Sequence, residues 1–441
     1  MTAIDEGLLS PVSVGHDDLV SDRSFLDALI RAEGALVSAY ASIGTAPREA
    51  QRDVDHALGL DEKGAPISFD VAEIAAAAAG GGNPVIPMVP RLKEAVPADA
   101  RVWIHRGATS QDIWDTAIMA TAQRATAQVR SSLGIAAHWL RQLAATHRDD
   151  LAVARTLTQH AVPTTIGLRA ATWARGLDRA VARLEALTFP AQLGGAGGTL
   201  ASFVEITGSV DAAQRLVAAY SSAAGLAAPD APWHVTRWPV TELGDALVQA
   251  VDAAGKLATD IATLSRTEIG EVAEGTGGGS SAMPQKQNPA EAVLIRSAAL
   301  RAPQLGATLH LAAALAGDER PDGAWHAEWQ TLRELLRLAL GASRHASSLA
   351  AHLRVDVEAC RRNLDLTGGL VLSERLSLVL TPLIGKERVS ALVRDAAAGG
   401  DLVALVRALP EASTLDVDAL LDASGYTGLA GPLVDTLQEK R

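Results

Sequence analysis

The sequence has a single cysteine, Cys360, so no disulfide can form within the chain. Aromatic residues are also few, at 3% of the total, although 48% of the residues are hydrophobic. Most of this apolar content is Ala and Leu, which favour helices and cover little strand surface. With 441 residues, the chain can bury a large core without disulfides or metals. We therefore predict an all-α protein, and a disordered or disulfide-stapled chain is excluded.

Runs of basic residues are missing, and the formal net charge is −12. Nothing in the chain could follow a phosphate backbone, so we expect no nucleic-acid partner, and an anionic substrate would need local donors in a pocket. No Cys-x-x-Cys or Cys/His cluster offers a metal site. The glycines of 194–198 (GGAGG) follow a predicted helix rather than a strand, which argues against a dinucleotide-binding loop. We therefore expect neither a metal nor an organic cofactor.

Long hydrophobic runs are missing too. Residues 1–19 have no basic n-region and no apolar core, so we expect no signal peptide. The stretch 306–317 (GATLHLAAALAG) is among the most apolar, yet it is too short for a membrane span of about 20 apolar residues. We expect a soluble, cytoplasmic protein with no membrane partner.

Helical periodicity dominates what is present. In 22–45, apolar residues recur at steps of three and four, whereas Asp27, Arg31 and Glu33 lie off this stripe. No strand of useful length is predicted. A helix of about 30 residues spans on the order of 45 Å and buries its apolar face best in a bundle. The other predicted helices, four of them long, are 47–58, 70–79, 111–148, 165–188, 240–270, 289–318 and 325–352.

This pattern predicts three domains. Residues 1–104 form an N-terminal helical domain, and 105–352 form a central long-helix bundle with a mobile serine loop at about 272–289. Residues 353–441 form a small C-terminal helical domain, because Gly, Pro, Asp and Ser divide this part into short helices. The Ala-rich faces of the long helices favour packing on further helices from other subunits.

The serine loop is the most informative stretch, with the sequence EGTGGGSSAMPQKQNP at 274–289. Its glycines reach backbone conformations closed to other residues, so we expect a loop that closes over a ligand and brings Ser280, Ser281, Lys286 and Asn288 to it. An ordinary linker between helices is the alternative. Lys286 argues against it, because it is one of only six lysines and lies between two amides.

Two further stretches carry candidate residues. In 105–112 (HRGATSQD), Thr109, Ser110 and Asp112 can cap the following helix, whose first N–H groups can hold a carboxylate. Capping alone explains Ser110 or Asp112, and His105 has a structural alternative as well. In 155–163 (RTLTQHAVP), Gln159 and His160 precede Pro163 at the predicted start of a helix.

Taken in chain order, the stretches 105–112, 155–163 and 274–289 together resemble the three motifs of the fumarase/aspartase superfamily. Residues 279–289 (GSSAMPQKQNP) are close to its signature GSSxMPxKxNP. The resemblance implies a long-helix bundle flanked by two smaller helical domains, no cofactor, and a homotetramer with sites shared between subunits. It makes Ser280 the proton-transfer residue and Ser281 its neighbour. The residues expected to bind the substrate or stabilise an enediolate are Lys286, Asn288, Thr109, Ser110, His105, Gln159 and His160.

Within the superfamily, the chain resembles the 3-carboxy-cis,cis-muconate cycloisomerases. The stretches GNPVIP (82–87), PWH (232–234) and WHAEWQTL (325–332) carry this likeness, together with the extended first motif. It implies reversible, cofactor-free lactonisation of 3-carboxy-cis,cis-muconate to 4-carboxymuconolactone in protocatechuate (β-ketoadipate) degradation. It also implies that His326 binds the substrate.

Leu157 separates this interpretation from its main rival. The chain also resembles adenylosuccinate lyases, which release fumarate by β-elimination, but these carry a histidine where this chain has Leu157. An amine leaving group needs a proton, whereas a carboxylate leaves as a stable anion, so Leu157 favours the cycloisomerase. A catalytically silent structural homologue is a third hypothesis, which the intact Ser280, Lys286 and Asn288 disfavour.

Overall fold

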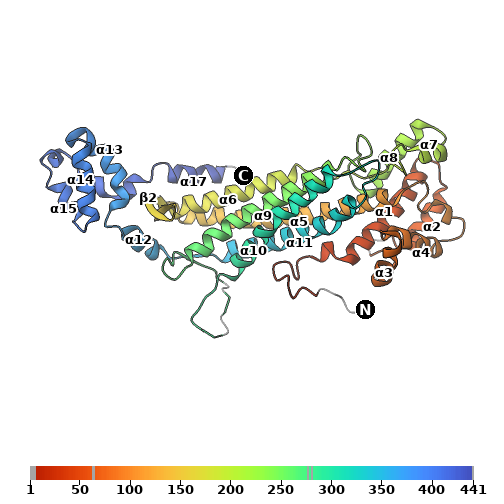
Figure 1. The fold of residues 1–441 in the computed structure, drawn as a ribbon, viewed down its shortest axis with the longest axis horizontal. Coiled ribbons are helices and arrows are strands. Elements are labelled where there is room, and N and C mark those ends of the chain that lie inside the picture. Colours follow the sequence, from red (N-terminus) through yellow and green to blue (C-terminus); the bar gives the residue numbers. More distant parts are fainter. Residues whose placement is uncertain (1–5, 62–64, 276–277, 280–281, 440–441) are drawn as a thin grey trace. The chain divides into compact units, whose positions relative to one another are not determined.

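The computed structural model describes residues 6–61, 65–275, 278–279 and 282–439, so Ser280 and Ser281 lie outside the described residues. Within the described chain there are 17 α-helices and four short strands, which confirms the predicted all-α class (Figure 1). The helices are α1 (Asp22–Ser42), α2 (Arg48–Leu58), α3 (Val71–Gly81), α4 (Val85–Ala95), α5 (Ser110–Thr146), α6 (Ile166–Glu185), α7 (Ala201–Thr207), α8 (Val210–Ala224), α9 (Trp238–Leu264), α10 (Ala290–Ala314), α11 (Ala324–His352), α12 (Val357–Asp365), α13 (Ser373–Ile384), α14 (Lys386–Ala397), α15 (Leu402–Arg407), α16 (Val417–Leu421) and α17 (Ala430–Glu439).

The chain divides into two compact units, each made of three chain segments. Unit 1 comprises Met1–Ser131, Ala182–Asp252 and Ser297–Arg344, and unit 2 comprises Ser132–Val181, Ala253–Arg296 and His345–Arg441. Five helices, α5, α6, α9, α10 and α11, contribute residues to both units. The expected division at residues 104 and 352 stays a prediction.

Glycines allow close packing of α9 on α10 in unit 1. A Cβ atom at Gly244 would lie 2.7 Å from Leu309 Cδ1, and one at Gly306 would lie 2.9 Å from Val248 Cγ2. Real side chains do not approach this closely, so larger residues would push the two helices apart. The small residues on these faces therefore serve helix packing inside one chain.

Helix α1 begins directly after Ser21, whose hydroxyl caps it by accepting a hydrogen bond from the Ser24 N–H at 3.2 Å. Its apolar face is buried, as expected. The prediction for Glu33 is wrong, because this residue is fully buried rather than off the buried face. Burial is possible because the carboxylate accepts two hydrogen bonds from His105, one from its backbone N–H and one from its ring.

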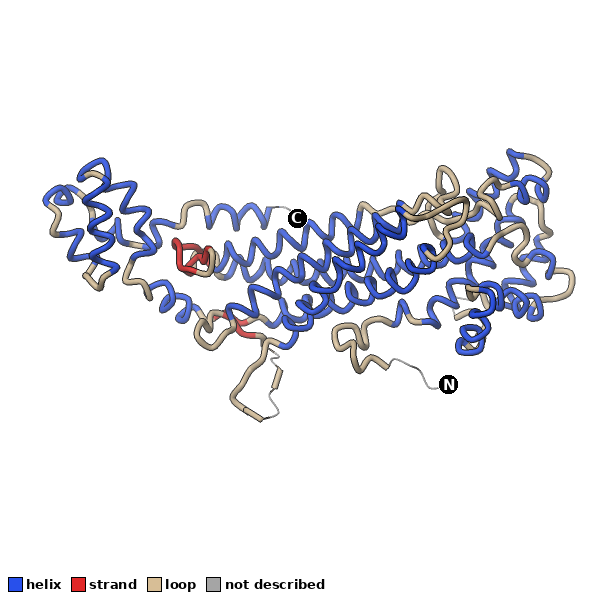
Figure 2. Tube along the Cα trace, in the orientation of Figure 1, coloured by secondary structure: helices blue, strands red, loops and turns tan. Residues whose placement is uncertain are grey.

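A β-hairpin lies between the predicted helices 111–148 and 165–188, where the sequence predicts no strand. Strands β1 (Leu151–Thr156) and β2 (Gln159–Thr165) pair antiparallel, and a second short pair joins β3 (Val272–Ala273) to β4 (Arg354–Val355) (Figure 2). Gln159 and His160 therefore lie on a strand, not at the start of a helix, and α6 begins only at Ile166. The segment is rich in Val and Thr, which favour strands. It turns without glycine at Leu157 and Thr158, so the usual hairpin signal is missing.

The sequence does not predict three further helices in unit 1: α4, α7 and α8. Helix α4 contains Pro87 and Pro90, and proline ordinarily marks a break. Pro87 falls in the first turn, where the missing N–H has no partner in the helix to lose. No single helix in the described chain is long and apolar enough to cross a membrane.

Candidate active site

The first turn of α5 presents two hydroxyl groups. Thr109 and Ser110 are half-buried, and no hydrogen bond is recorded for either hydroxyl within the described chain. The backbone N–H groups of a first helical turn lack partners in the helix and carry a partial positive charge. Hydroxyl and N–H groups together can therefore hold a carboxylate at this end of α5.

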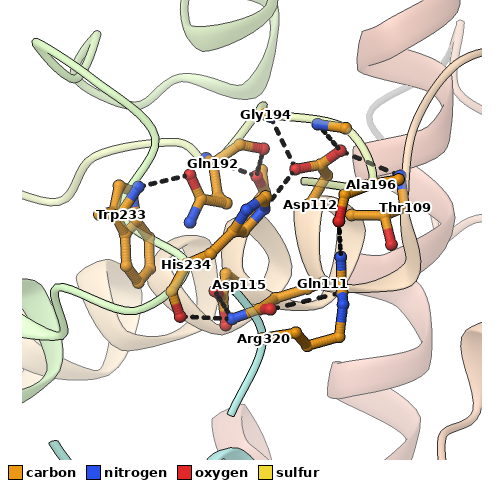
Figure 3. Close-up of polar contacts among 12 residues, drawn as sticks. Thr109, Gln111, Asp112, Asp115, Gln192, Gly194, Ala196, Trp233, His234 and Arg320 are labelled. Atoms are coloured by element: carbon orange, nitrogen blue, oxygen red, sulfur yellow. Dashed lines mark hydrogen bonds and ion pairs between the residues drawn. The ribbon is translucent and has the colours of Figure 1, made fainter. Parts of the chain in front are cut away.

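Asp112 is a buried hub rather than a binding group. Its carboxylate is fully buried and accepts hydrogen bonds from the Gly194 N–H at 2.8 Å, the Gly195 N–H at 3.0 Å and the Thr109 N–H at 3.0 Å. The Nε2–H of His234 donates to it at 2.8 Å (Figure 3). The predicted capping role of Asp112 is thus seen, through the Thr109 N–H. Because all four contacts are internal, the carboxylate is not available as a base.

A second buried network lies one turn further along α5. The guanidinium of Arg237 donates to Asp115 at 2.7 Å and to Glu328 at 2.7 Å, and the indole N–H of Trp325 donates to Asp115 at 3.1 Å. Burial raises the pKa of Glu328 above its usual range, although Arg237 opposes this shift. Gln111 joins the network by donating to Asp115 at 3.2 Å. The network fixes α5, α11 and the segment before α9 to one another.

Four residues of the cycloisomerase-like stretches make contacts inside the protein in or beside these two networks. Trp233 and His234 of PWH, and Trp325 and Glu328 of WHAEW, make internal contacts. His326 differs, because it is exposed on α11 and its Nε2–H donates to the Gly82 carbonyl at 3.0 Å. Its predicted role in substrate binding stays a prediction.

Arg320 is a cation that the sequence does not single out. Its guanidinium donates to the Ala196 carbonyl at 3.0 Å and reaches the Gln111 Oε1 at 3.4 Å, beside the start of α5 (Figure 3). It is half-buried and lies in the stretch GDERPDG that precedes α11. Its proximity to WHAEW in the sequence is the only signal that could have found it. Arg320 adds positive charge where Thr109 and Ser110 offer their hydroxyls.

His105 lies on the loop before α5, four residues before Thr109. Its ring Nδ1 and its backbone N–H both bind the carboxylate of Glu33. The side chain of His105 retains 20% exposure. His105, Thr109 and Ser110 are thus the predicted residues that unit 1 brings together on one loop and helix start.

Gln159 and His160 belong to unit 2. Gln159 is exposed, and His160 lines a cavity of about 740 Å³ together with Arg155, Arg169 and Lys256. Burial lowers the pKa of His160, and the nearby Arg155 lowers it further. His160 is therefore a neutral imidazole near pH 7, able both to donate and to accept a hydrogen bond.

Glu271 anchors this hairpin, and the sequence gives no signal for it. Its buried carboxylate accepts hydrogen bonds from Arg155 of β1, Arg169 of α6 and Asn363 of α12. Burial raises the pKa of Glu271, but the hydrogen bonds and the two arginines outweigh burial and hold it below its usual value. The cluster fixes the hairpin that carries Gln159 and His160.

The serine loop is closed at its base by backbone pairing. Gly278 and Asn288 exchange hydrogen bonds of 2.8 and 2.9 Å, and the Asn288 side chain donates to the Gly279 carbonyl at 3.3 Å. Lys286 is exposed, and its backbone N–H donates to the Met283 carbonyl. The predicted functions of Ser280 and Ser281 fall on residues outside the described ones. Lys286 and Asn288 lie in unit 2, and their predicted roles stay predictions.

Comparison with known proteins defines the class of this chain. A protein-family model described as "Lyase" matches residues 19–303. A nitrosuccinate lyase from Streptomyces davaonensis is 45% identical over 98% of this chain and 94% of its own length. A 3-carboxy-cis,cis-muconate cycloisomerase from Bradyrhizobium diazoefficiens is 37% identical over 98% of this chain and 97% of its own.

Solved structures agree with the sequence relatives. The 3-carboxy-cis,cis-muconate lactonizing enzyme from Pseudomonas putida superimposes with a TM-score of 0.87, at 34% identity, over 98% of both chains. The chain therefore belongs to the lyase family of the fumarase/aspartase superfamily, and it is an enzyme of that superfamily. The predicted likeness to the cycloisomerases is confirmed, and nitrosuccinate lyase adds a second relative that the sequence stretches did not indicate.

Proposed function

We propose that this enzyme catalyses β-elimination of nitrite from nitrosuccinate, giving fumarate. The 45% identity to a nitrosuccinate lyase over nearly the whole chain carries this choice of substrate. Leu157 is compatible with it, because this residue is 96% exposed at the tip of the β1–β2 hairpin and can supply no proton to a leaving group.

The chemistry fits a site without a general acid at residue 157. A base removes a proton from the carbon next to one carboxylate, and the C–N bond at the neighbouring carbon then breaks. The bonding pair leaves with the nitro group as nitrite, and the carbon–carbon double bond of fumarate forms. Nitrite is a weak base, as a carboxylate is, so it departs without protonation.

The proposed roles follow the superfamily motifs. Ser280 removes the proton, with Ser281 as its neighbour on the loop. Lys286 and Asn288, with Thr109 and Ser110, donate to the carboxylate on which the negative charge of the enediolate develops. His105, Gln159, His160 and His326 bind the remaining substrate oxygens. We propose a cytoplasmic homotetramer with shared sites, as the superfamily resemblance implies.

Lactonisation of 3-carboxy-cis,cis-muconate is the second candidate. The 37% identity to a cycloisomerase and the TM-score of 0.87 to a lactonizing enzyme support it. The reverse reaction, lactone opening, also expels a carboxylate from the carbon next to the one that loses its proton, so Leu157 fits it equally. The two reactions share one mechanism and differ in the group that leaves.

Parallel assays of the purified enzyme separate the candidates. We expect nitrosuccinate to give nitrite, measured colorimetrically, and an equal amount of fumarate, measured by ultraviolet absorbance. A loss of diene absorbance from 3-carboxy-cis,cis-muconate, without nitrite release, would establish the second candidate instead. Turnover of adenylosuccinate alone would contradict both, and turnover of none of the three would favour a catalytically silent homologue.

A further inference from the structure

Glu33 and His105 form a two-point contact between α1 and the loop before α5. The imidazole Nδ1–H of His105 donates to Glu33 Oε1 at 2.6 Å, and the backbone N–H of His105 donates to Glu33 Oε2 at 3.0 Å. The two residues are 72 positions apart in the sequence. Both carboxylate oxygens therefore hold the same residue, which fixes its backbone and its ring together.

The backbone of His105 shows that this contact overrides a local preference. Its φ is +58°, in the left-handed region that only a few per cent of residues other than Gly adopt. Such a conformation persists only where the surroundings enforce it. Glu33 is completely buried, and a buried carboxylate is stable only when it is paired. A purely structural role is one explanation of the contact between Glu33 and His105, but such a role does not require a titratable ring.

The free face of the ring suggests a further role. The Nδ1 atom of His105 is hydrogen-bonded to Glu33, and the other ring nitrogen, Nε2, has no partner within the described chain. Nε2 is therefore available to a ligand. The side chain keeps 20% of its exposure, and the loop leads directly to Thr109 and Ser110. The Arg106 carbonyl, next in the chain, accepts from the buried Tyr40 hydroxyl at 2.9 Å, which fixes the loop further.

We propose that Glu33 is a positioning residue: it holds His105 as an imidazolium whose Nε2–H donates to a carboxylate of the substrate. This inference rests on the proposed function only for the identity of the substrate. The charged ring compensates, at the site itself, for the unfavourable net charge of −12 on the whole chain. A charge-assisted hydrogen bond is stronger than one from a neutral imidazole.

The surrounding charges support a protonated ring. Burial alone would lower the pKa of His105, but the charge and hydrogen bond of Glu33 outweigh it, and Asp112 of α5 acts in the same direction. Lys93 of α4 opposes them, and the net shift is upward. Tyr220 of α8 also faces Glu33 and stays neutral, because burial raises its pKa. Substrate affinity should therefore be full at low pH and fall as pH rises through the raised pKa of His105.

Glu33→Gln tests the role in binding, because it keeps the shape and removes the charge. At pH 7 we expect KM for the dicarboxylate substrate to rise about tenfold, the difference between a charged and a neutral donor, with a smaller change in kcat. The pH at which KM begins to rise should move downward. Glu49→Gln, an exposed carboxylate on α2, is the matched control and should leave both unchanged. A KM profile in Glu33→Gln identical to that of the parent would overturn the proposal.

His105→Asn separates positioning from folding, because Asn accepts the left-handed backbone but carries no ionisable ring. If Glu33 acts through His105, adding Glu33→Gln to His105→Asn should change KM no further. A full additional tenfold loss in the double variant would show that Glu33 acts by another route.

A stability measurement tests the pair even if no substrate is turned over. The parent, Glu33→Gln, His105→Asn and the double variant are unfolded by denaturant at several pH values. Their free energies of unfolding give the coupling between Glu33 and His105. We expect favourable coupling below the raised pKa of His105 and its loss as pH rises through that pKa. Coupling that does not change with pH would contradict an imidazolium, whereas a failed substrate assay alone would contradict only the proposed reaction.

Discussion

Asp112 lies in a motif associated with substrate binding, yet its buried carboxylate is bonded to other parts of the protein. It accepts hydrogen bonds from Gly194, Gly195 and His234, and these bonds hold the glycine turn and His234 at the start of α5. The glycines of 194–198 thus form a structural turn in this chain, in which the N–H groups of Gly194 and Gly195 donate to Asp112. The residues left for a substrate at this end of α5 are His105, Thr109, Ser110 and Arg320.

Asp112→Asn should destabilise the fold. An amide cannot accept four hydrogen bonds, and its N–H₂ group would face N–H donors, so we expect a loss of about 2–3 kcal/mol in the free energy of unfolding. Denaturant unfolding measures this loss. Asp99→Asn removes an exposed carboxylate and should change stability by no more than about 0.5 kcal/mol. Equal stability of the two variants would show that Asp112 is not a hub.

Lys286 should affect turnover more than stability, since it is exposed on the serine loop. Lys286→Met keeps most of the stem and removes the charge, so we expect kcat to fall about 10²-fold or more, with weaker binding, because the enediolate carries more charge than the substrate. Lys286→Arg should rescue only part of this loss. Steady-state kinetics checks both, with Lys386→Met on α14 as the control. Parent-like kinetics in Lys286→Met would remove Lys286 from the site.

At the scale of elements, the helices were predictable because their signals are local. Apolar spacing and cap residues lie within a few positions, so α1, α5 and α11 begin close to where the sequence predicts. The hairpin was missed because its turn uses Leu157 and Thr158, at φ of 48° and 73°, in place of Asn or Gly. Its anchor, Glu271, lies 116 residues from Arg155, and no local pattern reports such a contact.

The left-handed backbone of Leu157 and Thr158 leads us to expect that this hairpin can be stabilised by substitution. Replacing Leu157 by Asn and Thr158 by Gly places residues that tolerate the left-handed conformation at both turn positions, so we expect about 1–2 kcal/mol of added stability. Leu366→Asn, at another exposed leucine whose φ is −53°, should give no such gain. Thermal unfolding of the three proteins provides the comparison. A destabilised double variant would show that Leu157 packs against something in the assembled protein.

At the scale of the whole molecule, the motifs identified the superfamily but not the role of each residue. PWH and WHAEW pointed correctly to the cycloisomerases and their relatives, yet their tryptophans and Glu328 build the interior around Asp115 and Arg237. Asp115 and Arg237 are 122 residues apart, and Glu33 was assigned to the wrong face of its helix for the same reason. Pairing between distant charges depends on the fold, so it is visible only in the structure.

We propose that this enzyme expels a stable anion and has no general acid for an amine. The most direct test compares two substituted succinates that differ in their leaving group, nitrosuccinate and adenylosuccinate, under identical conditions. We predict fumarate from nitrosuccinate and none from adenylosuccinate, because its unprotonated amine nitrogen needs a proton on leaving that Leu157 cannot provide. Fumarate released from adenylosuccinate at a rate comparable to that from nitrosuccinate would contradict this proposal.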